Sequence, residues 1–242
     1  MADTPVLSVR GLVKRYGNLE AVSGVEFDVA PGEIFALIGP NGAGKTTVLR
    51  IVGTILKATA GTATVDGIEV GDRPEKAREH ISYLPEEAGA YKNMTGMAYL
   101  RFFSELYFSD PVEQREAVER AREICGLGAR LKDKAGSYSK GMTRKLLLAR
   151  TLMCKPHLAI LDEPTSGLDV LNALEVRDTI KRHAADGTAI LLSSHNMLEI
   201  EYLSDRVGLL HQGHIREVGT PASLKERYSA SNLEEVFAEV AR

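Results

Sequence analysis

One stretch decides how this chain folds: Gly39-Pro40-Asn41-Gly42-Ala43-Gly44-Lys45-Thr46-Thr47, which directly follows the apolar run Ile34-Phe35-Ala36-Leu37-Ile38. A glycine, four further residues and then Gly-Lys-Thr, placed between a strand and a helix, form the pattern of a phosphate-binding P-loop. Glycines allow the backbone to adopt positive φ and to approach a polyphosphate closely. Their N–H groups, with those at the start of the next helix, make a concave anion site. We expect the whole stretch to bind the phosphates of a nucleotide.

Two side chains of this loop supply charge and a ligating oxygen. Lys45 offers a point charge to the β- and γ-phosphates, and the Thr46 hydroxyl is placed to bind Mg²⁺. The competing interpretation is a glycine-rich turn that merely starts a helix, but a chance match occurs in roughly one chain in a hundred of this length. The strand before the loop and the helix after it lower those odds further.

The composition excludes several classes of function. The chain has 242 residues with 30 basic and 33 acidic side chains, a net charge of −3, so it lacks the basic excess expected when nucleic acid is the main partner. No apolar run reaches the roughly 18 residues of a membrane span, and the first residues do not resemble a secretory signal. Cys125 and Cys154 have no metal or redox spacing and are expected to be buried and reduced. We expect a cytoplasmic chain that reaches a membrane only through a partner.

Hydrophobic periodicity places the remaining elements. Alternating or continuous apolar runs predict strands at 6–10, 25–29, 34–38, 62–65, 81–84, 158–161, 189–192, 206–210 and 214–218. Residues 11–17 are expected to be a connection. Helical spacing predicts helices at 45–55, around 99–106, between Asp110 and Gly126, and at 140–153, 168–183 and 232–237. The first of these helices is expected to bury Ile55 on its apolar face.

These patterns predict an α/β chain of the P-loop NTPase class. Continuous apolar strands are typical of a parallel sheet covered on both faces, and no strand pattern is convincing between Met94 and Cys154. We expect a mostly parallel central sheet, an N-terminal antiparallel β subdomain and an inserted α-helical subdomain. The whole chain, 1–242, is then a single domain. Its α/β and β core comprises 1–90 and 141–225, its helical subdomain 91–140, and its short C-terminal helix 226–242.

Candidate catalytic residues follow two of the predicted core strands. Asp162 and Glu163 end one strand and His195 follows another, and the carboxyl ends of parallel strands meet at the edge where α/β sheets bind ligands. Asp162 can hold Mg²⁺, usually through water. Glu163 can orient or deprotonate the attacking water. A neutral His195 can hydrogen-bond a γ-phosphate oxygen or position that water.

Tyr16 precedes the P-loop on a different predicted strand, so its ring could stack on a purine base. A single tyrosine more often packs in the core or at the rim of a domain. Both interpretations of Tyr16 stay open on the sequence.

Together these motifs resemble the ATPase subunit of an ATP-binding cassette (ABC) transporter, over a span from Tyr16 to His195. The most specific of them is Tyr138-Ser139-Lys140-Gly141-Met142, which opens a helix and resembles the family signature LSGGQ. Ser166-Gly167-Leu168-Asp169 is similar to the family's D-loop. The resemblance implies that Tyr16, Ser139, Gly141 and Asp169 join the P-loop in binding ATP. The hydroxyl of Ser139 and the backbone N–H of Gly141, at a helix N-terminus, can bind a phosphate by hydrogen bonds.

The resemblance also implies a mechanism and partners. In this family two cassettes, identical or different, pair head to tail, with ATP between the P-loop of one and the signature of the other. ATP binding closes the pair and hydrolysis opens it, which drives a separate multi-span transmembrane permease. The motifs, with the near-terminal segment 233–237, look most like ABC-2-type and multidrug exporters. The chain would then lie at the cytoplasmic face of the membrane, held by that permease.

Two alternatives remain. One is a soluble cassette ATPase that acts on ribosomes or DNA, and the other is a catalytically silent regulatory cassette. A single cassette without heptad repeats and a slightly acidic charge argue against the first. Intact Lys45, Asp162, Glu163 and His195 argue against the second.

Three positions depart from the family pattern. Glu86 stands where the family usually has the glutamine of the Q-loop, and its carboxylate can still bind Mg²⁺ or a water. Met142 replaces the last polar residue of the signature, and Lys140 replaces a glycine. We also expect a groove around 86–94 and the helix at Tyr99 to dock a helix of the membrane subunit, although core packing explains at least half of its aromatic residues.

Overall fold

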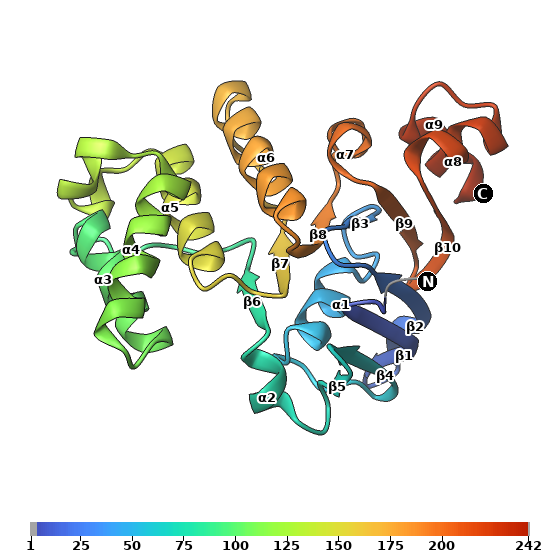
Figure 1. The fold of residues 1–242 in the computed structure, drawn as a ribbon. Coiled ribbons are helices and arrows are strands. Elements are labelled where there is room, and N and C mark those ends of the chain that lie inside the picture. The colour runs from blue at the N-terminus through green and yellow to red at the C-terminus, as the bar shows by residue number, and fades with distance from the viewer. Residues whose placement is uncertain (1–3, 242) are drawn as a thin grey trace.

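The structure is a computed structural model and describes residues 4–241. Within that part of the chain the strands form two β-sheets (Figure 1). The first is antiparallel, in the order β2-β1-β4-β5, and consists of β1 (Leu7–Tyr16), β2 (Leu19–Val29), β4 (Ala60–Val65) and β5 (Ile68–Glu69). Three apolar side chains of β1, Leu7, Val9 and Leu12, are fully buried beneath this sheet.

The predicted connection at 11–17 is wrong, because β1 continues through it to Tyr16. The register against β2 shifts between Val9 and Leu12, where Gly11 adopts a φ of 54°. This irregularity interrupts the apolar alternation, and residues 14–17, beyond the buried Leu12, are polar or exposed. Backbone pairing therefore continues where the side-chain pattern that predicts strands has stopped.

The second sheet is the core of the molecule, in the order β10-β9-β3-β8-β7-β6. Its strands are β3 (Ile34–Ile38), β6 (Ile81–Leu84), β7 (Leu158–Asp162), β8 (Ala189–Ser194), β9 (Arg206–His211) and β10 (His214–Gly219). The pairs from β9 to β6 are parallel, and β10 is antiparallel to β9. Every residue of β3, β7 and β8 is buried, which explains their continuous apolar runs.

The two faces of the core sheet carry different layers. Phe35 and Leu37 pack with the antiparallel sheet and with α1 (Lys45–Val52). Ala36 and Ile38 face the opposite cluster, which includes α5 (Lys140–Leu152), α6 (Val170–Ala185) and α7 (Met197–Leu203). The predicted fold class is confirmed by this layered arrangement.

The predicted burial of Ile55 is wrong, because α1 ends at Val52. Gly53 caps the helix, and Thr54 adopts a φ of 61° and turns the chain. Ile55 lies beyond that turn and is 56% exposed. A short helix, α2 (Pro74–Arg78), leads from the antiparallel sheet to β6.

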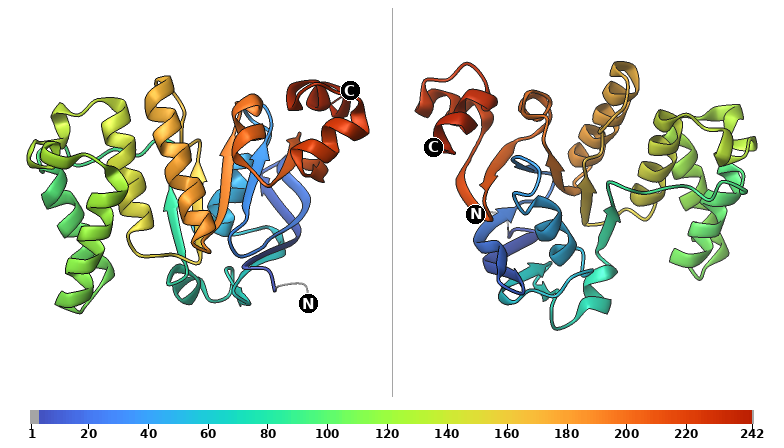
Figure 2. Two further views of the ribbon diagram at one scale, coloured as in Figure 1. Left: turned by 45° about the horizontal axis from the view of Figure 1, so that its top comes forward. Right: turned by 180° about the vertical axis from the view of Figure 1, so that it is seen from behind.

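Helices α3 (Gly96–Tyr107), α4 (Pro111–Cys125) and α5 lie together at one end of the molecule, beyond β6 (Figure 2). The start and stop of α4 are as predicted: the Asp110 side chain accepts a hydrogen bond from Val112 N at 2.9 Å, and Gly126 ends the helix with a φ of 60°. Turns of 3-10 helix at Gly128–Lys132 and Ala135–Ser137 lead to α5. Residues 94–154, all described, contain no strand, only an isolated bridge between Thr95 and Lys134.

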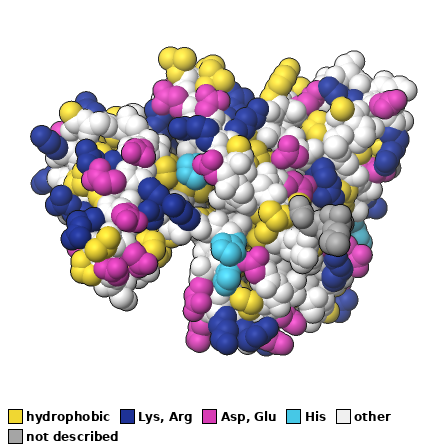
Figure 3. Space-filling view, viewed as in Figure 1, with side chains coloured by type: hydrophobic (Ala, Val, Ile, Leu, Met, Phe, Trp, Pro, Cys, Tyr) yellow, Lys and Arg dark blue, Asp and Glu magenta, His cyan; other side chains and the backbone are white. Residues whose placement is uncertain are grey.

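The surface is hollowed between these helices and the lower part of the core sheet (Figure 3). An open cleft of about 990 Å³ lies there. Its lining includes Arg120 and Glu123 of α4, Lys155 and His157 before β7, and Asp66 after β4.

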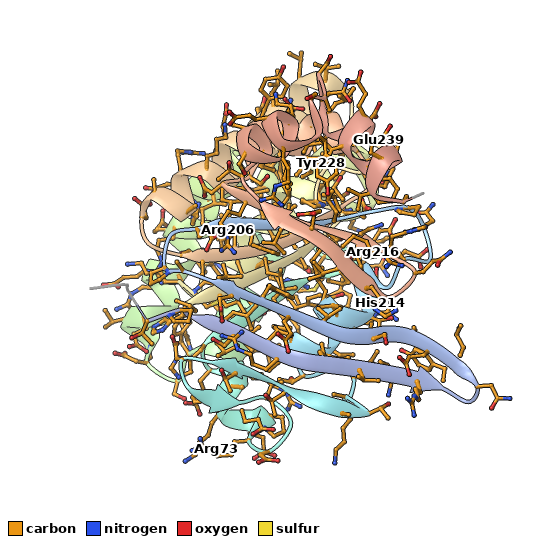
Figure 4. The ribbon with its side chains drawn as sticks, turned by 90° about the vertical axis from the view of Figure 1, so that its right-hand side faces the viewer. Arg73, Arg206, His214, Arg216, Tyr228 and Glu239 are labelled. Atoms are coloured by element: carbon orange, nitrogen blue, oxygen red, sulfur yellow. The ribbon has the colours of Figure 1, made fainter. Side chains whose placement is uncertain are left out.

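The chain ends in two helices, α8 (Pro221–Tyr228) and α9 (Leu233–Val240), that cover the β9–β10 side of the sheet (Figure 4). The Tyr228 hydroxyl donates a hydrogen bond to Glu217 Oε1 of β10 at 2.6 Å. Asn232 caps α9 by accepting from Glu235 N at 3.0 Å. Among the described helices, none is long and apolar enough to cross a membrane.

Candidate active site

The P-loop connects β3 to α1, and two of its glycines are required by close packing. A Cβ at Gly39 would lie 2.1 Å from the carbonyl oxygen of Leu210 in β9. Gly44 caps α1 with a φ of 108°, and a Cβ there would lie 2.5 Å from the carbonyl oxygen of Ala21 in β2. Both neighbours are backbone atoms that cannot move aside. The loop is thus held between the core sheet and the antiparallel sheet, and its N–H groups at the start of α1 form a cradle that fits phosphate oxygens.

Lys45 lies inside this loop with only 6% of its surface exposed. Its Nζ donates hydrogen bonds to the carbonyl oxygens of Gly39 at 2.7 Å and Pro40 at 3.1 Å. An ammonium group has three donors, so two fix its position and one can serve a phosphate. Burial lowers the pKa of Lys45, and the nearby carboxylates, Glu163 first, oppose this shift.

Asp162, the last residue of β7, is the centre of a group of hydroxyl side chains and is 1% exposed. Its Oδ1 accepts from Ser193 Oγ at 2.5 Å and from Thr46 Oγ1 at 3.2 Å, and its Oδ2 accepts from Tyr83 OH at 3.2 Å. These bonds compensate for burying the carboxylate. A carboxylate and a hydroxyl in direct contact offer the hard oxygen ligands that Mg²⁺ prefers, so Asp162 and Thr46 fit that ion.

The sequence did not single out Ser193 and Tyr83 as members of this group. Ser193 lies directly opposite Asp162 in the register of β8 against β7. Tyr83 belongs to β6, on the other side of β7. The sequence feature that points to Ser193 is the polar pair Ser193-Ser194, which ends an otherwise apolar strand.

Glu163 and His195 form a pair at the same edge of the sheet. Glu163 Oε1 lies 2.9 Å from His195 Nδ1; the Glu163 side chain is 7% exposed and the His195 side chain 52%. Burial raises the pKa of Glu163, while the hydrogen bond from His195 opposes that shift. A carboxylate whose pKa is raised is a better general base at neutral pH.

The backbone of Glu163 adopts a φ of 48°, which a residue with a side chain rarely does. Its N–H donates to both Ser193 O at 3.2 Å and Ser193 Oγ at 3.1 Å. Ser193 therefore holds the backbone of Glu163 as well as the carboxylate of Asp162. Strain maintained by surrounding bonds is typical of active sites.

Arg144 of α5 connects this edge to the segment that follows β6. Its guanidinium is buried and donates to the carbonyl oxygens of Pro85 at 3.3 Å, Glu86 at 3.1 Å and Glu163 at 3.3 Å. Burial lowers the pKa of Arg144, and Glu86 is the first of the carboxylates that oppose the shift. Glu86 is exposed, and its charge also acts on Lys45. The structure thus places Glu86 near the site, although the hydrogen bond it makes to Arg144 uses its backbone.

The signature-like segment and the D-loop-like segment pack against each other. Ser139 caps α5 by accepting from Met142 N at 3.2 Å, and a Cβ at Gly141 would lie 2.4 Å from the Asn172 side chain of α6. Asp169 caps α6 and accepts from Asn172 N at 3.0 Å and Asn172 Nδ2 at 2.6 Å. Ser139, Gly141 and Asp169 thus share one surface at the start of α6.

Tyr16 lies at the end of β1 and is 47% exposed, so it is not a core residue. The Lys14 Nζ lies 5.2 Å from the centroid of its ring. The β1–β2 hairpin that carries Tyr16 also contains Ala21, against which Gly44 packs. An aromatic ring is therefore available on the hairpin that borders the P-loop.

Known proteins share this fold and these motifs. The profile of the ABC transporter family matches residues 22–166. The linearmycin resistance ATP-binding protein LnrL of Bacillus subtilis is 33% identical over 228 residues, which cover 94% of this chain and 73% of that protein. A fluoroquinolones export ATP-binding protein of Mycobacterium tuberculosis is 40% identical over 227 residues, which cover 92% of this chain and 73% of that protein.

Solved structures of ATP-binding cassettes have the same fold as this chain. An ATP-binding subunit of an ABC transporter superposes with a TM-score of 0.87 at 29% identity, over 98% of this chain and all of that one. A dimeric ATP-binding cassette bound to ADP and Pi has the same fold, with a TM-score of 0.79 at 21% identity over 88% of this chain and 98% of that one. The chain therefore belongs to the ABC transporter family, as an ATPase close to the ATP-binding subunits of drug and antibiotic exporters.

Proposed function

We propose that this chain hydrolyses ATP at the edge formed by the P-loop, Asp162 and Glu163, and that it thereby powers export through a separate transmembrane subunit. The contact between Glu163 and His195, beside a buried Lys45, is the observation that carries the chemical part of this proposal. The export part rests on relatives whose names describe resistance and export.

We assign a separate step of ATP binding or hydrolysis to each group of site residues. The N–H groups of 39–47 and Lys45 Nζ hold the β- and γ-phosphates. Thr46 and Asp162, with Glu86 beside them, hold Mg²⁺, which neutralises phosphate charge when bound. Glu163 takes a proton from the water whose oxygen attacks the γ-phosphorus, and the bond from that phosphorus to the β–γ bridging oxygen breaks to give ADP and phosphate. His195 fixes the Glu163 carboxylate and positions the water or a γ-phosphate oxygen.

We infer that two cassettes complete the site. Gly141 lies against Asn172 of α6 and Ser139 caps α5, so the N-terminus of α5, a good phosphate-binding element, would face a partner. A head-to-tail pair would place this element over the ATP held by the other P-loop, with Asp169 at the interface. Tyr16 would stack on the adenine from its own hairpin. A dimeric cassette among the fold neighbours supports this arrangement.

We propose that the membrane partner docks on the surface of α3 and the segment before it. Tyr99 is buried and Phe103 packs on the core, but Tyr91 is 52% and Phe102 is 38% exposed. These two rings contact each other edge to face at a centroid distance of 6.0 Å. Exposed, adjacent aromatic rings fit an apolar helix of the permease, which would hold the chain at the cytoplasmic face of the membrane.

The test uses Glu163→Gln, which keeps the size and hydrogen bonding of the side chain and removes its basic oxygen. It should bind Mg-ATP normally, hydrolyse it at least about a hundredfold more slowly, and accumulate as a dimer in size exclusion with Mg-ATP. Glu226→Gln, an exposed carboxylate on α8, is the matched control and should behave as wild type. Turnover by Glu163→Gln near the wild-type rate would remove Glu163 from its role and make His195 the next candidate.

A further inference from the structure

A second group of ligating side chains lies at the opposite end of the core sheet from Asp162. His80 directly precedes β6 and His157 directly precedes β7, so both stand where parallel neighbouring strands begin. Asp66 follows β4 of the antiparallel sheet. Figure 3 shows histidine side chains beside an acidic side chain on this face. Since β7 spans Leu158–Asp162, this group is roughly 15 Å from the ATP site along the strand.

The ligating atoms of the three side chains converge. Asp66 Oδ2 lies 2.7 Å from His80 Nδ1 and 2.6 Å from His157 Nδ1, and the two Nδ1 atoms are 3.4 Å apart. The imidazole rings meet edge to face at an interplanar angle of 89°. Each ring therefore points the same nitrogen at the same carboxylate oxygen, although the residues come from three separate parts of the chain.

Backbone hydrogen bonds fix the main-chain position of each of the three residues. His80 O accepts from Leu158 N at 3.0 Å, His157 O accepts from Ala189 N at 2.9 Å, and Asp66 N donates to Val6 O at 2.8 Å. Asp66 itself has a φ of 48° in the turn between β4 and β5. The group is thus anchored on rigid strand ends rather than on flexible loops, as a preorganised binding site requires.

We propose that Asp66, His80 and His157 form a binding site for a divalent transition metal ion, of which Zn²⁺ fits the donor set best. Imidazole nitrogen with one carboxylate suits Zn²⁺ rather than Mg²⁺ or Ca²⁺, which prefer oxygen ligands. Bonds of about 2.05 Å in a tetrahedron place two nitrogens about 3.3–3.4 Å apart, and the two Nδ1 atoms are 3.4 Å apart. The Asp66 oxygen lies 2.6 and 2.7 Å from the two nitrogens, so it would have to move about 0.7 Å away from each to take the same spacing.

The site is reachable and has room for a fourth ligand. The His157 side chain is 59% exposed, His80 is 28% and Asp66 is 25% exposed. Asp66 and His157 also line the open cleft of about 990 Å³ beside α4. Water can complete the coordination from this side, as in zinc sites with three protein ligands.

Binding there would join the two sheets. Asp66 directly follows β4 of the antiparallel sheet, whereas both histidines directly precede strands of the core sheet. A bound ion would replace a hydrogen-bonded contact by coordinate bonds and restrain the antiparallel sheet against the sheet that carries the P-loop. The consequence is a metal-dependent stability that does not require ATP.

The experiment measures Zn²⁺ binding by calorimetry on the tag-free chain, stripped with chelator and without nucleotide. Wild type should bind one equivalent, and His80→Ala, His157→Ala and Asp66→Asn should each weaken binding by at least about tenfold. Asn tolerates the left-handed turn conformation, so Asp66→Asn keeps the hairpin. His214→Ala, an exposed histidine on β10, is the matched control and should bind as wild type.

The same series of variants distinguishes this site from another pair of residues that could bind Zn²⁺. The pair of His195 and Glu163 could also bind Zn²⁺, so His195→Ala must retain the binding that His157→Ala loses. Co²⁺ should give the intense visible absorption of a tetrahedral site in wild type and not in His157→Ala. Zn²⁺ at a hundredfold excess over Kd should raise Tm by about 5–10 °C in wild type and not in Asp66→Asn. Equal binding by wild type and all three ligand variants, or loss only in His195→Ala, would overturn the assignment.

Discussion

Ser193→Ala tests whether one hydroxyl organises both acidic residues of the ATP site. Ser193 is fully buried, and its Oγ donates to Asp162 Oδ1 at 2.5 Å and accepts from Glu163 N at 3.1 Å. The N–H of Glu163 keeps the backbone oxygen of Ser193 as a partner. The main loss is therefore the bond to a buried carboxylate, worth about 1.5–3 kcal/mol. Thermal unfolding should show a Tm about 3–12 °C lower, at 2–4 °C per kcal/mol for a chain of this size.

The same substitution should change the dependence on Mg²⁺. Loss of a side chain that orients a metal ligand typically costs 10–100-fold in affinity. Titration of ATPase activity with Mg²⁺ should therefore show half-activation at roughly tenfold or higher concentration. Asp162→Asn should show a larger change in the same direction, because it removes the proposed Mg²⁺ ligand itself.

Ser82→Ala provides the control for removing a buried serine hydroxyl. Ser82 lies on β6, and its buried Oγ has no hydrogen-bond partner among the residues that the structure describes. Its replacement should leave stability unchanged or higher, because no bond is lost. The reasoning fails if Ser193→Ala is as stable as Ser82→Ala, or if it loses stability while its Mg²⁺ titration is unchanged.

Three further predictions concern single side chains. Lys45→Ala should abolish ATP binding in Mg²⁺ buffer, because it removes the side-chain cation of the P-loop, and unchanged affinity in a fluorescent-nucleotide assay would contradict the site. Tyr16→Ala should weaken nucleotide binding by about 1 kcal/mol, the scale of one aromatic stack, whereas Tyr16→Phe should be nearly neutral; equal losses would point to the hydroxyl. Burial raises the pKa of Glu163 above its ordinary value near 4.5, so its ionised form destabilises the fold at neutral pH. Glu163→Gln should therefore unfold at a higher temperature than wild type at neutral pH, and the gain should vanish as pH falls below that ordinary value, where both folded and unfolded wild type are protonated.

Much of the site could be predicted because parallel strands impose a common edge. The continuous apolar runs of β7 and β8 are buried on both faces, so Asp162, Glu163 and His195 had to emerge together beside the P-loop. The structure confirms their proximity: Thr46 and His195 contact the two acidic residues directly.

The parts that could not be predicted depend on contacts without a sequence pattern. Arg144 binds backbone carbonyls, and every residue type supplies those. Helices α7 and α8 are short, and their caps, Asn196 and Thr220, are polar residues that also begin ordinary turns. His80 and His157 are 77 residues apart. The rule that joins the carboxyl ends of neighbouring strands applies equally to their amino ends, and applying it there would have placed these two histidines side by side.

Arg144 couples the position of α5 to two segments of the ATP site. Its guanidinium leaves α5, the helix that begins with the signature, and reaches carbonyls on two different segments, at Pro85–Glu86 and at Glu163. Because the guanidinium is planar and its donors are fixed relative to one another, its bonds to both segments depend on where α5 lies. A movement of α5 away from the sheet that breaks these bonds would cost about 1.5–3 kcal/mol for each bond to the charged group. The position of the Glu163 peptide, whose carboxylate is the proposed general base, is therefore coupled to the position of the helical end of the molecule.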